Sequence, residues 1–356
     1  MIMKYELEKL IKNKNFFGTT IALLLVMLGI FFIGFYYSQL SLSDKSNEAK
    51  GYPELYSEVS SKHTGEFNDQ KVREILTDYI NRYQSDSVEK RPFDLFSWDI
   101  ADVFFPQDKD TYIQMNTEIE RGKKVTLDQI NISTVKEVGF TSFSAPLKIG
   151  SYHTWNDLFN VTNNLFILTS LFTILICSTV FSSEVSSNIN QLLLSTKYGR
   201  SKLIVAKLFT ATGISILVFL IIQLISLFVF YTYYGMSGWD ASIQTNFHLK
   251  LFSFPMEINN LQVYSLVLGF QMVNLFAIAG ITLLISSFTK STFGSLVISL
   301  GAFFLPLALT YIFKTGFVNK LLYLFPINNY NVEEILTVMP ELVPLPKTLF
   351  LQCVLC

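Results

Sequence analysis

Five long stretches without a charged residue restrict what this chain can fold into. Each is longer than the roughly 20 apolar residues that a helix needs to span a bilayer. Backbone groups in lipid must bond within their own segment, so a single apolar stretch of this length forms a helix there. Only 15% of the residues are charged, whereas an ordinary soluble domain has about 25%. We therefore predict an all-α polytopic membrane protein with five complete transmembrane helices, in Phe16–Ser43, Leu158–Ser183, Leu208–Trp239, Ile258–Thr289 and Ser291–Phe313.

A sixth apolar segment begins at Thr348, close to the end of the sequence. Only nine residues remain from there, which make about 14 Å of helix at 1.5 Å per residue. A hydrocarbon core is about 30 Å thick. We therefore expect residues 158–356 to hold transmembrane helices 2–5 and the start of a sixth that is cut short.

Charges near the first apolar stretch indicate the orientation of the chain. Residues 1–15 have apolar positions at helical spacing, which predicts an amphipathic helix on the inner membrane face before transmembrane helix 1 at 16–38. By the positive-inside rule, the lysines of this segment place the N-terminus in the cytoplasm, and they are Lys4, Lys9, Lys12 and Lys14. The predicted location is the plasma membrane, as a multi-pass protein.

Residues 39–156 differ in composition from the rest of the chain. Between Leu40 and Trp155 there are 19 acidic and 14 basic residues, a net charge of −5. A segment this polar does not enter lipid. We predict a small, mainly helical extracytoplasmic domain between the first two spans, with an α+β fold as the alternative.

Three patterns indicate secondary structure in this domain. The residues from Phe67 to Tyr83 have a 3.6-residue period, with Asn68 as the N-cap and Phe67 and Val72 placed for a hydrophobic staple. A second helix is expected from Asp108 to Arg121, ended by the glycine that follows. The mixed pattern from Lys123 to Phe143 predicts one or two strands.

Motifs of nucleotide-binding and hydrolytic enzymes are absent from the sequence. There is no G-x-x-x-x-G-K-[ST] loop, no H-E-x-x-H and no G-x-S-x-G. His63, His153 and His248 lie far apart in the sequence, without a carboxylate pattern around them. Asp108 and Asp110 form an acidic pair that suits a divalent cation, although a capped helix start explains them more simply. We expect a non-catalytic chain that holds no metal or cofactor and binds no nucleic acid.

The interiors of the spans carry no acidic or basic residue, unlike most ion-coupled transporters. Three amides remain, and such groups usually bond a neighbouring helix, with lining of a transport pathway as the alternative: Gln223, Gln271 and Asn274. Small residues four apart in the fifth span predict close helix packing at Ser291, Ser295 and Ser299. Energy for transport then has to come from another chain.

The segment 182–207, between the second and third spans, is the strongest candidate functional site. Four bases and one acid predict that it lies in the cytoplasm. Its apolar residues predict a short helix with one apolar stripe, which contacts a partner protein or else rests on the membrane surface or on the protein's own helices. Alternatively, the bases only keep the loop in the cytoplasm, and Glu184 only caps the loop helix at its N-terminus. The candidate residues are Glu184, Val185, Ile189, Leu192, Leu193, Lys197, Arg200 and Lys207.

Several of these segments resemble the ABC-2 type permease subunits of ABC transporters. The resemblance rests on Phe181-x-x-Glu184, a helix that ends Leu-Leu-Leu-Ser195-Thr, and Arg200 and Lys207 before the next span. The start Tyr5-Glu-Leu-Glu-Lys-Leu-Ile-Lys12 and the turn Ser286-Ser-Phe-Thr-Lys290-Ser-Thr look like the same family. The segment Pro146-Leu-Lys-Ile-Gly150-x-x-x-Trp155 is similar to Gram-positive members with a large outer loop.

The resemblance implies a six-span fold whose loop helix docks in a groove of a cytoplasmic ABC-type ATPase. Two permease chains, identical or different, would pair above two ATPase chains, surrounded by membrane lipid. The expected function is the permease subunit of an ATP-driven exporter of an amphipathic or peptide-like substrate. One alternative is a membrane-anchored sensor or accessory protein with a ligand-binding outer domain. Another is a membrane-embedded transferase that uses Asp108 and Asp110.

Overall fold

The chain folds into two compact units. The computed structural model describes residues 2–12, 14–37, 52–85, 95–106, 111–189, 192, 195 and 201–338. The first unit, called the membrane unit below, comprises Met1–Phe32, Phe159–Val229 and Ser265–Cys356. The second unit comprises Ile33–Leu158 and Phe230–Tyr264.

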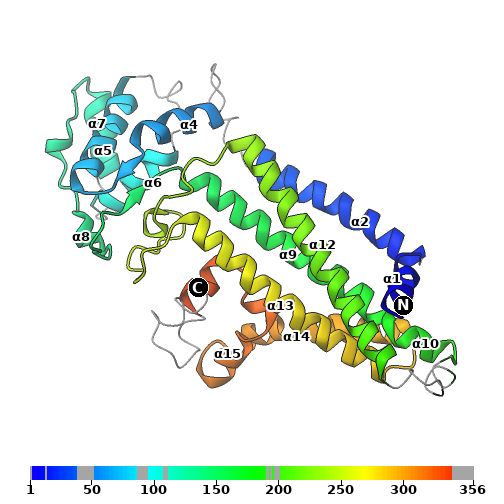
Figure 1. Cartoon of the computed structure of the whole chain (residues 1–356). Helices are drawn as coiled ribbons and strands as arrows, with labels where there is room; N and C mark the ends of the chain where they lie inside the picture. Colours follow the sequence, from blue (N-terminus) through cyan, green and yellow to red (C-terminus); the bar gives the residue numbers. More distant parts are fainter. Residues whose placement is uncertain are drawn as a thin grey trace. The chain divides into compact units, whose positions relative to one another are not determined.

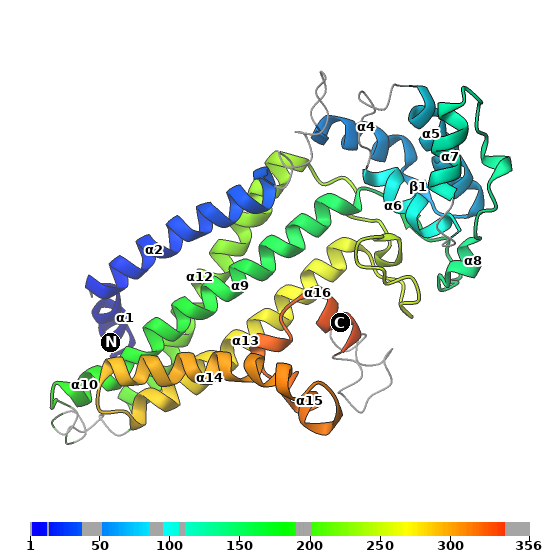
Figure 2. The same cartoon turned by 180° about the vertical axis from the view of Figure 1, so that it is seen from behind.

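In the described part of the chain, five helices are long and apolar enough to cross a membrane, which confirms the all-α polytopic class. Figures 1 and 2 show these helices from two sides. The first is the span Phe16–Tyr36, built from α2 (Lys14–Phe31) and a π-helical segment (Phe32–Tyr37). The others belong to α9 (Tyr152–Val180), α12 (Lys202–Tyr234), α13 (Asn260–Phe288) and α14 (Thr292–Ile312). The predicted start of a sixth span lies outside the described residues.

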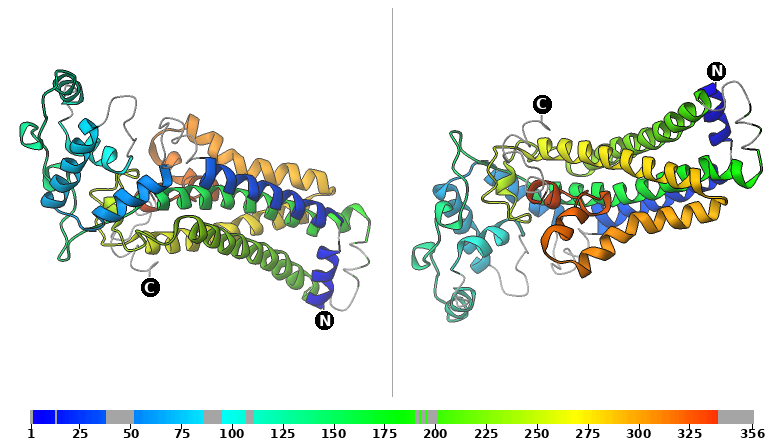
Figure 3. Two further views of the ribbon diagram at one scale, coloured as in Figure 1. Left: turned by 90° about the horizontal axis from the view of Figure 1, so that it is seen from above. Right: turned by 90° about the horizontal axis from the view of Figure 1, so that it is seen from below.

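Aromatic and aliphatic side chains hold the membrane unit together. Its main cluster draws on α9, α12, α13, α14 and the turn Pro326–Asn328, and it contains Phe166, Ile174, Phe219, Leu275, Ile278, Phe303 and Ile327. The ring of Phe16 on α2 meets the ring of Phe172 on α9 edge-on, with centroids 6.0 Å apart. The long helices of this unit extend in a common direction (Figure 3). Before α2, the short helix α1 (Ile2–Ile11) begins the chain.

Three short helices follow the fifth span: α15 (Gly316–Leu322), the 3₁₀ turn η4 (Pro326–Asn328) and α16 (Val332–Thr337). Two of the predicted amides hold this segment to α13. The Gln271 side chain donates to the Tyr330 carbonyl oxygen at 3.0 Å, and the Asn274 amide donates to Asn329 Oδ1 at 2.6 Å. Amides are effective there because an unpaired polar group in lipid is costly.

The second unit is mainly helical in its described part. Its elements are α4 (Tyr52–His63), α5 (Asp69–Ser85), α6 (Leu95–Phe104), α7 (Thr111–Glu120), α8 (Val135–Val138), the 3₁₀ turns η2 (Leu127–Gln129) and η3 (Ile243–Thr245), and the strands β1 (Gly65–Glu66) and β2 (Lys148–Ile149). The two strands pair antiparallel, with Gly65 opposite Ile149.

The prediction of strands between Lys123 and Phe143 is wrong. This stretch contains η2 and α8 instead. The Thr134 hydroxyl accepts from the Glu137 amide, and the Glu137 carboxylate accepts from the Thr134 amide at 2.7 Å. This capping box starts a helix whose four residues are too few to show a period in the sequence.

The loop between the third and fourth spans belongs to the second unit, which the sequence did not indicate. Phe247 packs into the aromatic core of this unit, with ring centroids 5.9 Å from Phe67 and 5.6 Å from Tyr152. Gly238 is required where the loop passes the start of α9, because a Cβ there would lie 2.6 Å from the Ser151 carbonyl oxygen. The Trp155 indole donates to the Ser237 carbonyl at 2.9 Å.

Candidate functional site

The loop between the second and third spans begins with a very short helix. After α9 ends at Val180, helix α10 covers only Ser182–Ser186. It stops there because Asn188 adopts a left-handed conformation with a φ of 57°, which asparagine tolerates better than most residues. The predicted single helix that would carry Val185 and Ile189 on one stripe is therefore interrupted.

Two of the predicted apolar residues are exposed. Ile189 is 47% and Leu192 is 70% exposed, whereas Val185 is half-buried. Leu193, Lys197 and Arg200 lie outside the described residues. The described part of the loop thus offers apolar surface that the membrane unit itself does not cover.

Glu184 is the centre of a cluster of charged side chains from three helices. Its Oε1 accepts from Lys9 Nζ of α1 at 2.7 Å and also forms an ion pair with Lys207 Nζ of α12. Lys207 Nζ lies 3.9 Å from Glu6 Oε2 of α1 and 5.6 Å from the centroid of the Phe181 ring. We call Glu6, Lys9, Glu184 and Lys207 the ionic cluster. It joins α1, α10 and α12.

Burial makes most of this cluster energetically important. Glu6, Glu184 and Lys207 are each less than 10% exposed, whereas the Lys9 side chain is 42% exposed. A buried charge that loses its partner costs about 3–5 kcal/mol, but an exposed pair contributes only about 0–1 kcal/mol. Two acids and two bases leave the cluster without net charge, so each buried charge in it has a partner.

Ser286 connects the same loop to α13. Its buried hydroxyl oxygen accepts from the backbone amides of Phe181 and Ser182, at 3.2 and 3.1 Å, and its proton goes to the Ser178 carbonyl oxygen at 2.8 Å. These bonds replace helical bonds that are lost where α9 gives way to α10. Helix α10 is thus bonded to α1, α12 and α13.

The three serines predicted for helix packing have different positions. Ser291 is the N-cap of α14, and its hydroxyl accepts from the Gly294 amide at 3.0 Å. Ser295 and Ser299 are 0% and 2% exposed. Small side chains at the two buried positions allow close approach of a neighbouring backbone.

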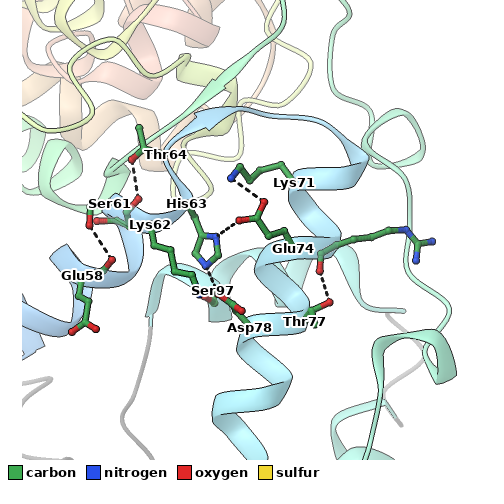
Figure 4. A network of polar contacts seen from close by, with 12 residues as sticks. Glu58, Ser61, Lys62, His63, Thr64, Lys71, Glu74, Thr77, Asp78 and Ser97 are labelled. Carbon is green, nitrogen blue, oxygen red and sulfur yellow. Dashed lines mark hydrogen bonds and ion pairs between the residues drawn. The ribbon is translucent and has the colours of Figure 1, made fainter.

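All three histidines have a charged or ring partner, although the sequence showed no such pattern. The imidazole of His63 has no exposed surface and lies 3.5 Å from Glu74 Oε1 and 3.1 Å from Asp78 Oδ2 (Figure 4). His153 Nε2 lies 2.8 Å from Asp99 Oδ2, and the His153 and His248 rings are 5.9 Å apart. Among the described residues, no three or more His, Cys, Asp or Glu side chains are placed to hold a metal ion. Asp108 and Asp110 lie outside that part of the chain.

Sequence reasoning missed two members of the ionic cluster and the serine beside it. Glu6 and Lys9 are three residues apart, so they share a face of α1, but nothing in the sequence tells which charges that face meets. Lys9 contributes to the positive-inside rule and, with Glu6, to the segment that resembles the family, but neither use assigns it a partner. Ser286 was part of the family resemblance without a role of its own.

Comparison with known proteins agrees with this layout. A family model described as ABC-2 family transporter protein matches residues 1–346. Neither the curated proteins nor the solved structures gave a match. Because the family model covers nearly the whole chain and the five apolar helices fit a transport subunit, the protein belongs to the ABC-2 family and is a membrane permease of an ABC transporter.

Proposed function

We propose that a separate ABC-type ATPase drives this permease by contacting the loop 182–207. The observation that carries the proposal is the pair of exposed apolar side chains, Ile189 and Leu192, beside the buried ionic cluster. Apolar side chains that become buried at the centre of an interface contribute much of its binding energy. The sequence has no phosphate-binding loop of its own, so ATP hydrolysis belongs to the partner.

The ionic cluster would carry the movement from the ATPase into the membrane unit. A movement of the loop would be transmitted to α1 and α12 through Glu184, and to α13 through Ser286. Since separating the buried Glu184 and Lys207 would cost about 3–5 kcal/mol, these helices are expected to move as one body. Glu184 and Lys207 thus transmit the movement and take no part in hydrolysis.

The rest of the assembly follows from the family and from charge. We propose that two such permease chains pair above two ATPases, with the N-terminus in the cytoplasm of a bacterial cell. The uncharged interiors of the spans suit export of an amphipathic or peptide-like substrate better than export of a small ion.

Substitution in the loop tests the contact. When the permease is co-expressed with its candidate ABC-type ATPase, Leu192→Asp should abolish co-purification of the ATPase, because the contact would bury an unpaired charge. Ser195→Asp is the matched control, since it adds the same charge at another exposed position of the loop. It should leave co-purification largely intact.

Membrane insertion should be equal for both variants, because residues 192 and 195 lie outside the candidate spans. Equal recovery of the ATPase with Leu192→Asp and with the unchanged chain would refute the proposed contact.

A further inference from the structure

A cavity opens in the membrane unit beside the proposed ATPase contact. Its volume is about 560 Å³, within the range of about 300–1,000 Å³ typical of ligand sites. It lies where the start of α2 meets the end of α9 and the start of α14. The apolar part of its wall consists of Leu10, Phe16, Leu175, Ile176, Phe293 and Leu296.

The polar part of the wall offers only hydroxyl groups, and no charged residue lines the cavity. Several of these hydroxyls are already used within their own helices. Thr19 donates to the Phe16 carbonyl, Ser178 to Leu175 and Thr179 to Ile176, at 2.8–3.1 Å. A site without a charged side chain does not favour an ion, because burying a charge unpaired is costly.

The depth of the cavity corresponds to one leaflet of a bilayer. Its wall on α9 and α10 runs from Leu175 to Ser183, which is about 12 Å along a helix axis. Half of a hydrocarbon core is about 15 Å. At the Ser183 end, Lys290 stands exposed two residues before the lining residue Thr292 and supplies the charge of the rim. The next residue after Ser183, Glu184, is buried in the ionic cluster. The cavity thus has an apolar depth and a charged rim.

The cavity lies between the two spans that are least covered by protein. Only 17% of the first span and 22% of α14 are buried within the chain, and its rim residues Gly18 and Phe293 are exposed. The chain itself leaves this surface uncovered, so it is open to the surrounding lipid. From the apolar depth, the charged rim and the lipid-facing opening, we propose that the cavity binds an acyl chain of a membrane phospholipid, whose headgroup lies at the rim. The proposal is independent of the ATPase contact.

Photolabelling of the full-length chain tests this assignment. The chain is placed in nanodiscs of phosphatidylcholine and phosphatidylglycerol that contain a small fraction of phosphatidylcholine with a diazirine in its acyl chain. After irradiation, we expect labels on 175–183 and 293–296 that saturate at a low probe fraction. Labels at the exposed residues Leu217 and Leu224 of α12 should instead rise in proportion to the probe.

Two glycines of α2 provide a filling variant and its control. Neither Gly18 nor Gly29 has a neighbouring atom within 4 Å of the place where a Cβ would lie, but only Gly18 lines the cavity. Gly18→Phe should remove the saturable labels and keep those at Leu217 and Leu224, while Gly29→Phe should change neither. Thr179→Phe fills the cavity from α9 and should act like Gly18→Phe.

Two results would overturn the proposal. One is labelling of the cavity that never saturates or that survives both filling variants. The other is a disulfide between two copies of a Phe293→Cys chain, formed in the same nanodiscs, which would show that a second copy covers the opening.

Discussion

Lys207 illustrates how single residues of this chain gain a role that their sequence position does not show. It is almost fully buried at the start of α12, yet its ammonium group has Glu184 and Glu6 as partners and the Phe181 ring beside it. A base near the end of a span is ordinarily a topological signal. In this structure it also joins helices that are far apart in the sequence.

His63 is a second residue whose environment decides its chemistry. Burial lowers the pKa of its imidazole, because the charged form loses its hydration, and the nearby carboxylates of Asp78 and Glu74 only partly offset this. Lys62 and Lys71, which pair with these two acids, oppose protonation as well. The folded second unit therefore favours the neutral form of His63.

The stability of the second unit should depend on pH through His63. Below a pH of about 6.5 the unfolded chain binds a proton at His63, which the folded chain takes up only at lower pH because its pKa is lowered. The free energy of unfolding should therefore be highest above that pH and decrease as the pH falls. Thermal unfolding followed by tryptophan fluorescence reports on this unit, since Trp98, Trp155 and Trp239 all belong to it.

The variant His63→Leu should weaken this pH dependence. It leaves both acids paired, because Lys62 keeps Asp78 and Lys71 keeps Glu74. Burial also lowers the pKa of His248, so His248→Gln serves as the comparison for the remaining pH dependence. An unchanged dependence in His63→Leu would show that His63 is not responsible.

At the scale of elements, local signals determined where several helices begin and end. The helix predicted from Phe67 to Tyr83 is α5, Asp69–Ser85. Asn68 Oδ1 accepts from the Lys71 amide at 2.9 Å, and Phe67 and Val72 are both in the core cluster. The predicted N-cap is therefore confirmed. The loop helix shows the limit of such signals, because the left-handed Asn188 ends it before its apolar spacing does.

Removal of the α5 cap should destabilise the second unit. Asn68→Ala leaves the Lys71 amide without its partner and should lower the free energy of unfolding by about 1 kcal/mol. Asn68→Asp retains an acceptor oxygen at the cap and is the matched control. Urea unfolding followed by tryptophan fluorescence measures both. Equal loss of stability in the two variants would contradict a role of the cap.

At the scale of the whole molecule, the family match and the five spans do not determine on which side of the membrane each loop lies. The second unit contains the start of α9, the end of α12 and the start of α13. Alternating passage through the membrane places these three ends on one side, as the charge-based scheme also predicts.

Cysteine labelling in intact cells tests this orientation. The background chain carries Cys353→Ser and Cys356→Ser and keeps the buried Cys177. In this background, Ser61→Cys should react with an impermeant thiol reagent from outside. Ser187→Cys should react only after the membrane is opened. Both positions are exposed, so access alone distinguishes them. The reverse pattern would exclude the proposed orientation.

The sequence by itself determined the class of fold and the chemistry that is missing. Long uncharged stretches have only one stable form in lipid, so the spans follow from composition. An N-cap such as Asn68 acts within one helical turn, so it is readable locally as well. The absence of a phosphate-binding loop is likewise a property of the sequence.

Only the tertiary structure decided which distant residues meet. Glu6 and Lys9 join Glu184 and Lys207 across more than 170 positions of the chain, and Phe247 packs with Phe67 in the second unit. Such pairings depend on how several helices pack at once, and helical periodicity states only which face is apolar. The cavity arises in the same way, because it is the space that three helix ends leave between them.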